Sequence, residues 1–245
     1  MEDKSIKIVY LYHSGFVVET QNHFLVFDYF NDTPNNSARS LSNGVVSPSD
    51  FPVDKQILVF VTHQHRDHFN PIIFNWDKNH SNIKYILSSD IELGEYKNNY
   101  FQLDKYETLK INNVEISTFG STDLGVSYLV SVDGVTIFHG GDLNWWHWKE
   151  FSREQQLKEE LDFKAEVNKL IGKKIDIAFI PVDPRLEELY YLAGEYFINV
   201  IKPKLLIPIH FADNCNITKV FAEKINDNKK VAIIERRGQI IEYTI

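Results

Sequence analysis

The sequence predicts an α+β fold built from two β-rich halves, with helices before, between or after the strands. Two observations predict it. Short apolar runs rich in β-branched residues recur between polar breaks, as buried strands do. The pattern then changes over 151–171 to a charged segment with helical spacing. With 245 residues, 43% of them hydrophobic, the chain can bury a sizeable core. We expect one domain over residues 1–245, with its halves meeting near 110–120.

The composition limits the compartment and the partners. The chain has 26 basic and 34 acidic residues, a net charge of −8 that gives no broad attraction to nucleic acid or anionic lipid. Cys215 is the single cysteine, so no internal disulfide forms. Residues Met1–Ser5 are polar, without the apolar core of a secretion signal, and no run approaches the roughly 18 apolar residues of a membrane span. We expect a cytoplasmic protein that binds neither nucleic acid nor membrane; whether it forms a homo-oligomer stays open.

Three apolar runs open the chain and predict an antiparallel meander: Ile6–Leu11, Phe16–Thr20 and Phe24–Asp28. The first break contains His13, which is either a group that supports a nearby metal site or a hydrogen-bonded turn residue. Residues 31–54 are rich in Asn, Ser, Pro and Gly and predict a long loop of roughly 20 residues. This loop either lines a substrate entrance or is an uninvolved surface segment.

The strongest signal in the sequence follows the apolar run Ile57–Val61, which predicts a buried strand. Thr62-His63-Gln64-His65-Arg66-Asp67-His68 places three imidazoles and a carboxylate within six residues. Side chains two apart on an extended segment share a face, so His63 and His65 can point at one centre. Asp67 and His68 then lie in the turn, before a helix that Asn70 and Pro71 would start. Imidazole and carboxylate are ligands for zinc, and also suit iron or manganese.

The middle of the chain predicts further strands at Ile83–Leu87, Val114–Phe119, Val126–Val132 and Val135–His139. Ser88-Ser89-Asp90 has the composition of a helix cap. Asp133-Gly134 is typical of a hairpin turn.

His139-Gly140-Gly141-Asp142 closes that hairpin and places a carboxylate at a strand end, where Asp142 can ligate or bridge metal. The aromatic run that follows includes Trp145, Trp146 and His147. These side chains form either core anchors or a wall that excludes water from the metal, with His147 as a substrate contact.

The C-terminal part alternates helices and strands. A charged helix over Phe151–Ile171 would bury a stripe of Leu157, Leu161, Val167, Leu170 and Ile171, and Gly172 would end it. The segments that follow are a strand at Ile175–Ile180, a helix at Leu186–Ile201, a strand at Leu205–Ile209, a helix at Thr218–Ile225, and closing strands at Val231–Ile234 and Gln239–Tyr243.

Two strand ends in this part carry candidate site residues. His210 follows its strand directly, as His63 does, and the earlier motif favours a ligand role for it. After the preceding strand, Asp183 and Arg185 occupy a turn and are candidate substrate-binding residues. Arg185 is a candidate contact for an anionic substrate, or a surface arginine in a salt bridge.

The HxHxDH motif at His63–His68, the later Gly141-Asp142 and the strand-end His210 together resemble the metallo-β-lactamase superfamily of metal-dependent hydrolases. The chain looks most like the compact branch that includes ascorbate-phosphate lactonase-like proteins. The resemblance implies an αββα four-layer sandwich. It also implies one metal on His63 and His65, a second on Asp67, His68 and His210, a bridging Asp142, and a shared water or hydroxide that attacks the substrate. The ligand histidines need hydrogen-bond acceptors, a role open to Asp28, Asp183 or backbone carbonyls.

One departure from the family pattern concerns the first metal. Most two-metal members have another His just before the Gly-Asp turn, but no His occurs between His80 and His139. Asp123 is a candidate substitute ligand, Ser121 or Thr122 could hold a water, or only the second metal binds. Losing an imidazole mildly favours a harder cation such as manganese. We therefore expect one or two divalent ions, with zinc foremost and manganese or iron as alternatives.

The leading hypothesis is a metal-dependent hydrolase that uses a metal-bound water or hydroxide, with Asp67 and His68 at its centre, on a small ester, lactone or phosphate-bearing substrate. A nuclease or phosphodiesterase is the nearest alternative, although the chain lacks a basic track. A di-iron redox enzyme would have a carboxylate at His65 and a flavin-binding domain. A metal-binding sensor or scaffold without turnover is the remaining alternative.

Overall fold

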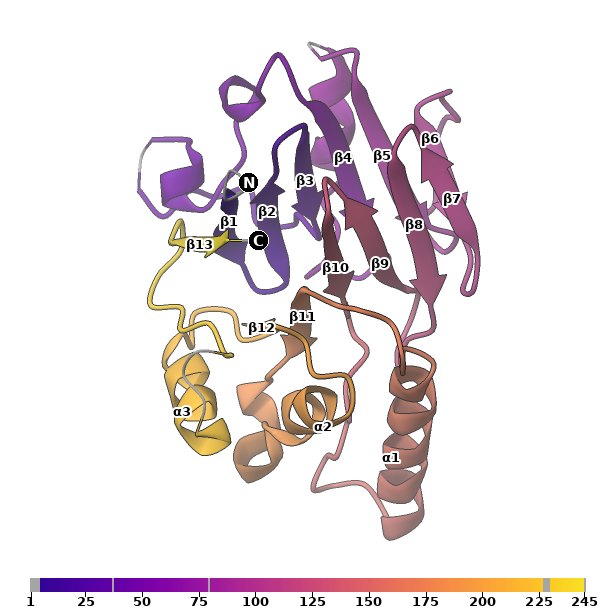
Figure 1. Ribbon diagram of the computed structural model, residues 1–245, viewed down its shortest axis with the longest axis vertical. Helices are drawn as coiled ribbons and strands as arrows, with labels where there is room; N and C mark the ends of the chain where they lie inside the picture. The colour runs from indigo at the N-terminus through magenta and orange to yellow at the C-terminus, as the bar shows by residue number, and fades with distance from the viewer. Residues whose placement is uncertain (1–4, 37, 79, 227–229, 245) are drawn as a thin grey trace. The chain divides into compact units, whose positions relative to one another are not determined.

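The computed structural model describes residues 5–36, 38–78, 80–226 and 230–244 (Figure 1). The polar start at Met1–Lys4 lies outside the described residues. The chain divides into two compact units. The first unit comprises 1–104 with 235–245, and the second comprises 105–234. The second unit thus begins at Lys105, slightly before the junction expected near 110–120.

A seven-stranded sheet forms the first unit, in the order β13-β1-β2-β3-β4-β5-β6. Its strands are β1 (Ser5–Tyr12), β2 (Gly15–Glu19), β3 (His23–Phe27), β4 (Gln56–Val61), β5 (Ile83–Ser88), β6 (Tyr100–Leu103) and β13 (Ile240–Thr244). The antiparallel meander β1-β2-β3 is confirmed, and β3 to β6 run parallel. Strand β13 pairs antiparallel with β1, so segments from opposite ends of the chain lie side by side (Figure 1).

Three 3-10 helices accompany this sheet: Leu41–Asn43, Pro48–Asp50 and Pro71–Lys78. One hydrophobic cluster joins Phe51, Ile73 and Trp76 to the strand residues Val26 and Val59. The segment expected to be a long loop therefore packs against the sheet through Phe51. The predicted start of the third helix is confirmed, because the Asn70 side chain accepts a hydrogen bond from the backbone of Ile72 at 3.0 Å.

The prediction of a helix cap at Ser88–Asp90 is wrong, because the next element is β6. The Asp90 carboxylate instead accepts a hydrogen bond from the Gln64 backbone at 3.0 Å. A side-chain oxygen that can cap a helix can equally support a neighbouring loop.

The second unit contains a six-stranded sheet in the order β12-β11-β10-β9-β8-β7. Its strands are β7 (Thr108–Ile111), β8 (Val114–Phe119), β9 (Ser127–Val132), β10 (Val135–His139), β11 (Ile177–Pro181) and β12 (Leu205–Ile209). The predicted hairpin at Asp133-Gly134 is confirmed, with positive φ at both residues. Strands β10, β11 and β12 run parallel, so their carboxyl ends share one edge of the sheet.

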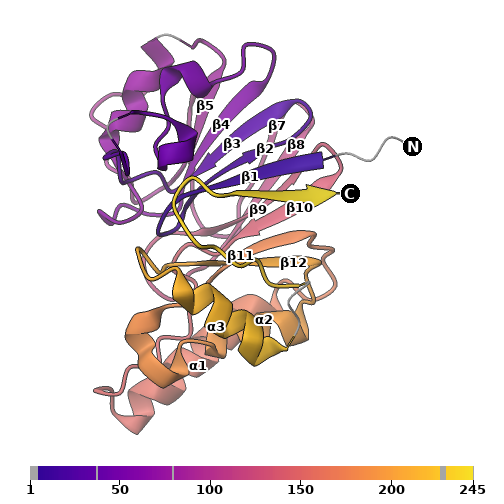
Figure 2. The same cartoon turned by 90° about the vertical axis from the view of Figure 1, so that its left-hand side faces the viewer.

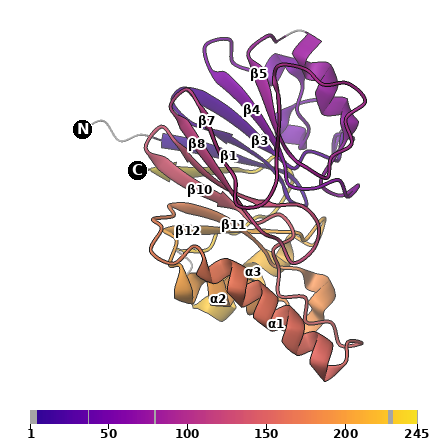
Figure 3. The same ribbon diagram turned by 90° about the vertical axis from the view of Figure 1, so that its right-hand side faces the viewer.

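Helices α1 (Arg153–Asn168), α2 (Leu192–Val200) and α3 (Asn216–Ile225) gather on one face of this sheet (Figures 2 and 3). They form one hydrophobic cluster with the strands, in which Phe163, Phe197 and Phe221 are fully buried. At the start of α1, Ser152 and Gln155 form a capping box.

The predicted buried stripe of α1 is wrong at three positions. Leu157, Leu161 and Ile171 are 53%, 57% and 59% exposed. The buried face is Phe163, Val167 and Leu170, which repeat at i, i+4 and i+7. An aromatic side chain rather than the leucines therefore anchors this helix.

Two further predictions differ from the structure. The helix expected over Leu186–Ile201 is divided into a 3-10 helix at Pro184–Leu189 and α2, with Glu187 at a positive φ of 52°. Val231–Ile234 contributes only an isolated bridge to β12. Among the described residues, no helix has the length and apolarity that crossing a membrane requires.

Candidate metal centre

The first unit holds its ligand motif through a buried carboxylate. Parallel pairing of β3 with β4 brings Asp28, just beyond β3, beside Thr62, just beyond β4. The Thr62 backbone N–H and hydroxyl donate to the two Asp28 oxygens at 2.8 and 2.7 Å. Asp28 has no exposed surface and a left-handed φ of 43°. The strand ends therefore form a rigid support beneath the histidines.

Hydrogen bonds assign the nitrogen that each buried imidazole of this unit can offer to a metal. His68 Nδ1 lies 2.7 Å from Asp28, which as a carboxylate only accepts, so Nδ1 carries the proton. The Thr62 hydroxyl donates to Asp28 and can therefore accept from His63 Nδ1 at 3.1 Å. In both rings the proton on Nδ1 leaves Nε2 in the form that binds a metal.

The HxHxDH motif converges in the folded unit. The ring centroids of His63 and His65 lie 4.7 Å apart, and those of His63 and His68 lie 4.1 Å apart. His63 and His68 are fully buried, whereas the Asp67 side chain is 45% exposed. Four donors of metal-binding type therefore gather after a single strand.

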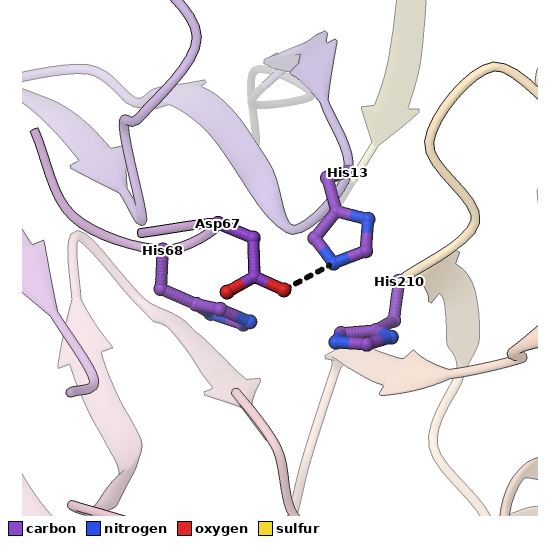
Figure 4. Close-up of side chains that lie close together, drawn as sticks. All are labelled: His13, Asp67, His68 and His210. Atoms are coloured by element: carbon purple, nitrogen blue, oxygen red, sulfur yellow. Dashed lines mark ion pairs between the residues drawn. The ribbon is translucent and has the colours of Figure 1, made fainter. Parts of the chain in front are cut away.

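His13 joins this group from the turn between β1 and β2. Figure 4 shows its imidazole directed at the Asp67 carboxylate, with His68 alongside. Nε2 of His13 lies 3.6 Å from Oδ2 of Asp67, and the rings of His13 and His68 meet edge to face. The His13 imidazole beside the carboxylate favours its ionised form and is the main reason that the pKa of Asp67 lies well below its usual range. Burial opposes this effect, and His68 adds to it.

The second unit builds its donor group at the shared edge of β10, β11 and β12. Asp142 follows β10 through two glycines. A Cβ on Gly140 would lie 3.1 Å from the Phe179 carbonyl oxygen, and Gly141 has a φ of 54°. His210 follows β12 and brings its Nε2 within 3.1 Å of the Asp142 carboxylate.

A second buried carboxylate orients His210. Asp183, just beyond β11, has no exposed surface and lies 3.0 Å from His210 Nδ1. Arg185 donates to both oxygens of Asp183. Burial opposes ionisation of Asp183, but the hydrogen bonds from His210 and Arg185 prevail and lower its pKa to about 2. His210, like His68, would therefore bind a metal through Nε2.

The loop without a histidine is fixed against the Gly-Asp turn. The Thr122 hydroxyl lies 2.6 Å from the Asn144 carbonyl oxygen, to which it donates, and accepts from the Asn144 backbone at 2.9 Å. These bonds oppose the idea that Thr122 holds a water. Asp123 is exposed, and its ligand oxygen lies within 4.8 Å of that of Asp142.

The aromatic run after Asp142 divides between the core and the site. Trp145 packs against Phe163 of α1, as a core anchor does. Trp146 lies with its ring 5.6 Å from that of His210 and is stacked on Trp148. His147 is half-buried with its ring near Trp145. The wall interpretation therefore fits Trp146 better than Trp145.

Each unit by itself brings together the candidate ligands that it contains, and their distribution over one or two ions stays a prediction. Asp183 accepts hydrogen bonds from both Arg185 and His210 and so orients the His210 ring, whereas the substrate contact considered for Arg185 stays a prediction. The structure adds His13 beside Asp67 and Thr62 beneath the histidines. The position of Thr62 directly before the motif was the available signal for it. Whether these groups bind metal stays a prediction, but imidazole Nε2 atoms and carboxylates are a donor set that fits a divalent ion.

Comparisons with known proteins agree with this chemistry. The family model described as "Beta-lactamase superfamily domain" matches residues 7–210. A metal-dependent hydrolase of Pyrococcus furiosus is 25% identical over 97% of this chain and 99% of its own. A metallo hydrolase from Ignicoccus hospitalis has a TM-score of 0.63 at 14% identity, with 98% of each chain covered. A metallo-beta-lactamase fold protein from Bacillus subtilis has a TM-score of 0.61 at 12% identity, covering 98% of this chain and 100% of its own.

Proposed function

The chain belongs to the beta-lactamase superfamily and has its fold, and on that premise we propose a metal-dependent hydrolase acting on a small ester, lactone or phosphate-bearing substrate. The observation that carries the proposal is a pair of buried hydrogen bonds. In one, His68 Nδ1 donates to Asp28, and in the other, His210 Nδ1 donates to Asp183. Carboxylates that hold Nδ1 are what metal-ligating histidines require, and they fix the ring that presents Nε2.

The ligand assignment follows the two units. In the first unit the proposed ligands are His63, His65, Asp67 and His68, and in the second unit they are Asp142 and His210, with Asp123 as a substitute for the missing imidazole. A bound divalent ion would lower the pKa of water to about 7 and polarise a substrate oxygen.

The protein side chains contribute position and charge. Asp28 and Asp183 hold the ligand rings, and the guanidinium of Arg185 keeps Asp183 ionised. Arg185 also lies over the rings of Trp146 and Trp148, with its carbon 5.9 and 5.6 Å from their centroids. Its side chain is 56% exposed, so it is available to an anionic substrate group.

The primary experiment is metal analysis of protein purified without chelator, reported as metal per chain. A ratio near one supports loss of the first metal position, whereas a ratio of two requires Asp123 or another group to complete it. Zinc, manganese and iron are measured together, because an oxygen ligand in place of imidazole mildly favours the harder ions.

Turnover is tested on a panel of model esters, lactones and phosphodiesters before and after chelation. We expect activity that chelation abolishes and metal restores. His68→Ala should lose both metal and activity, whereas His80→Ala serves as a control outside the ligand group. The hydrolase assignment fails in favour of a sensor if metal binds but no substrate is turned over.

A nuclease is the alternative of closest chemistry. The net charge of −8 weakens attraction to a phosphate backbone. Cleavage of single-stranded nucleic acid at rates above those for small phosphodiesters would favour it.

A further inference from the structure

We propose that His13 is a metal ligand, and that its Nε2 completes a three-donor set with Asp67 and His68 inside the first unit. This inference rests on the proposed function and adds to it a residue outside the HxHxDH motif. The set would combine two imidazoles with one carboxylate, an arrangement that binds divalent iron, zinc or manganese and leaves positions open.

The backbone holds His13 in an uncommon conformation. His13 lies in the tight turn after β1, at a φ of 57°, where the left-handed region costs a residue with a side chain about 1–2 kcal/mol. The pairing of β1 with β2 shifts register between Tyr10 and Tyr12, an irregularity that redirects side chains near sites. The His13 N–H donates to the buried Tyr10 hydroxyl at 2.9 Å. Strain that the surroundings maintain points to a function for the side chain.

The distance between His13 Nε2 and Asp67 Oδ2 fits two ligands of one metal ion better than a direct hydrogen bond. N–H···O bonds have a donor–acceptor distance of about 2.7–3.2 Å, and the 3.6 Å from His13 Nε2 to Asp67 Oδ2 exceeds it. Two donors bound tetrahedrally at about 2.1 Å to one ion lie about 3.4 Å apart. The ligand atoms of His13, Asp67 and His68 all lie within 4.8 Å of one another. This spacing suits donors around an ion better than partners in a direct bond.

The surroundings of the imidazole favour the same conclusion. The His13 side chain is 10% exposed, and its ring meets Phe30 edge to face with centroids 6.1 Å apart. Phe30 covers part of the ring with apolar surface, while Nε2 faces the carboxylate (Figure 4). His68 is fixed by Asp28 and presents Nε2 as well. The three donors therefore come from two separately supported turns of one sheet.

His13→Gly in the full-length chain is the decisive variant. Glycine adopts a positive φ without penalty, so this change removes the imidazole and relieves the backbone. Asn112→Gly is the matched control, because Asn112 also has a positive φ, 54°, and lies in a turn of the second unit. Unfolding midpoints of the metal-free proteins confirm that each variant folds.

The first readout is the affinity for the first equivalent of Mn²⁺ or Co²⁺ per chain, measured by titration. We expect His13→Gly to weaken binding more than about 100-fold, beyond the ten- to hundredfold loss that follows removal of a residue that only orients a ligand. Asn112→Gly should bind as the parent does. Added free imidazole should restore much of the affinity of His13→Gly.

The second readout counts imidazole nitrogens on bound Mn²⁺ by pulsed electron paramagnetic resonance. The parent should show one more coordinated imidazole than His13→Gly. An equal count, with affinity changed less than tenfold, would overturn the proposal and leave His13 as a neighbour of Asp67. Failure of the proposed function itself gives a different result, in which the parent binds no metal and His68→Ala changes nothing.

Discussion

Each of the two units holds a buried histidine through a hydrogen bond from Nδ1 to a buried carboxylate, but different partners stabilise the two carboxylates. In the first unit, Asp28 receives the backbone N–H and hydroxyl of Thr62 together with His68. In the second unit, Asp183 receives the charged guanidinium of Arg185 together with His210. Asp28 is strained and enclosed, whereas Asp183 has an extended backbone and a partner that is 56% exposed.

The two carboxylates are stabilised by different partners. Dipoles fixed by the strand ends stabilise Asp28, so its support is inseparable from the fold of the sheet. A partly exposed guanidinium stabilises Asp183, and water can replace that cation when it is lost. We therefore expect changes at Asp28 to affect folding most and changes around Asp183 to be tolerated better.

Asp28→Asn should have the largest effect. Its amide group would face donors that need an acceptor, and breaking such a buried pair costs about 3–5 kcal/mol of unfolding free energy. Urea denaturation of chelator-treated protein measures the loss. Asp54→Asn, at an exposed position of the same unit, should stay within about 0.5 kcal/mol. If Asp28→Asn lowers the unfolding free energy no more than Asp183→Asn does, the fold does not depend more on Asp28.

Asp183→Asn should cost less, about 2 kcal/mol, since hydrogen bonds to a charged group are worth about 1.5–3 kcal/mol and Arg185 can turn to water. Metal affinity should fall about ten- to hundredfold, because His210 loses the partner that orients it. Denaturation without metal and titration with metal separate the two effects. Unchanged affinity would show that His210 needs no such support.

Gly15→Ala tests whether the strained Asp28 backbone depends on its neighbour. A Cβ at position 15 would lie 2.9 Å from the Asp28 carbonyl oxygen and 3.0 Å from that of Tyr12, neither of which can move cheaply. We expect a loss of about 1–2 kcal/mol by urea denaturation. Gly94→Ala is the control, because no atom lies within 4 Å of its added carbon. Equal stability of the two variants would contradict the close approach.

Arg185→Ala should have the smallest effect near neutral pH, about 1 kcal/mol, and a distinct dependence on pH. The pKa of Asp183 in the folded protein, about 2, lies below its unfolded value of about 3.9. The carboxylate therefore stabilises the fold above about pH 4, and this contribution is lost as the pH falls toward 2. Without Arg185 the folded pKa rises, so the loss begins at higher pH. Denaturation of metal-free protein between pH 2 and 7 measures it, with Arg153→Ala as an exposed control.

Much of the architecture was predictable because local signals agreed with the final fold. Residues that favour turns follow the strands before His63 and His210. They also join the two strands of the hairpin at Asp133-Gly134. The resemblance to the superfamily, drawn from His63–His68, Gly141-Asp142 and His210, is confirmed. The open role given to Asp28 and Asp183 as acceptors agrees with the hydrogen bonds that the structure shows.

The remaining features depend on contacts between segments distant in the sequence. Leu157 and Phe163 both fit a helical stripe, and only packing against the sheet selects Phe163. Strands β6 and β7 have only four residues each, too few for an alternating pattern to stand out. Nothing local distinguishes His13 as a neighbour of Asp67, because the meeting of two turns sets that proximity.

The pairing of β13 with β1 has a consequence for synthesis. The first unit is discontinuous in sequence, and its edge strand emerges from the ribosome only after the whole second unit. The second unit is contiguous, so it can complete its sheet while β1 still lacks its outer partner. Until β13 has been synthesised, the outer edge of β1 would lack its partner strand, and an unpaired strand edge can pair with other chains.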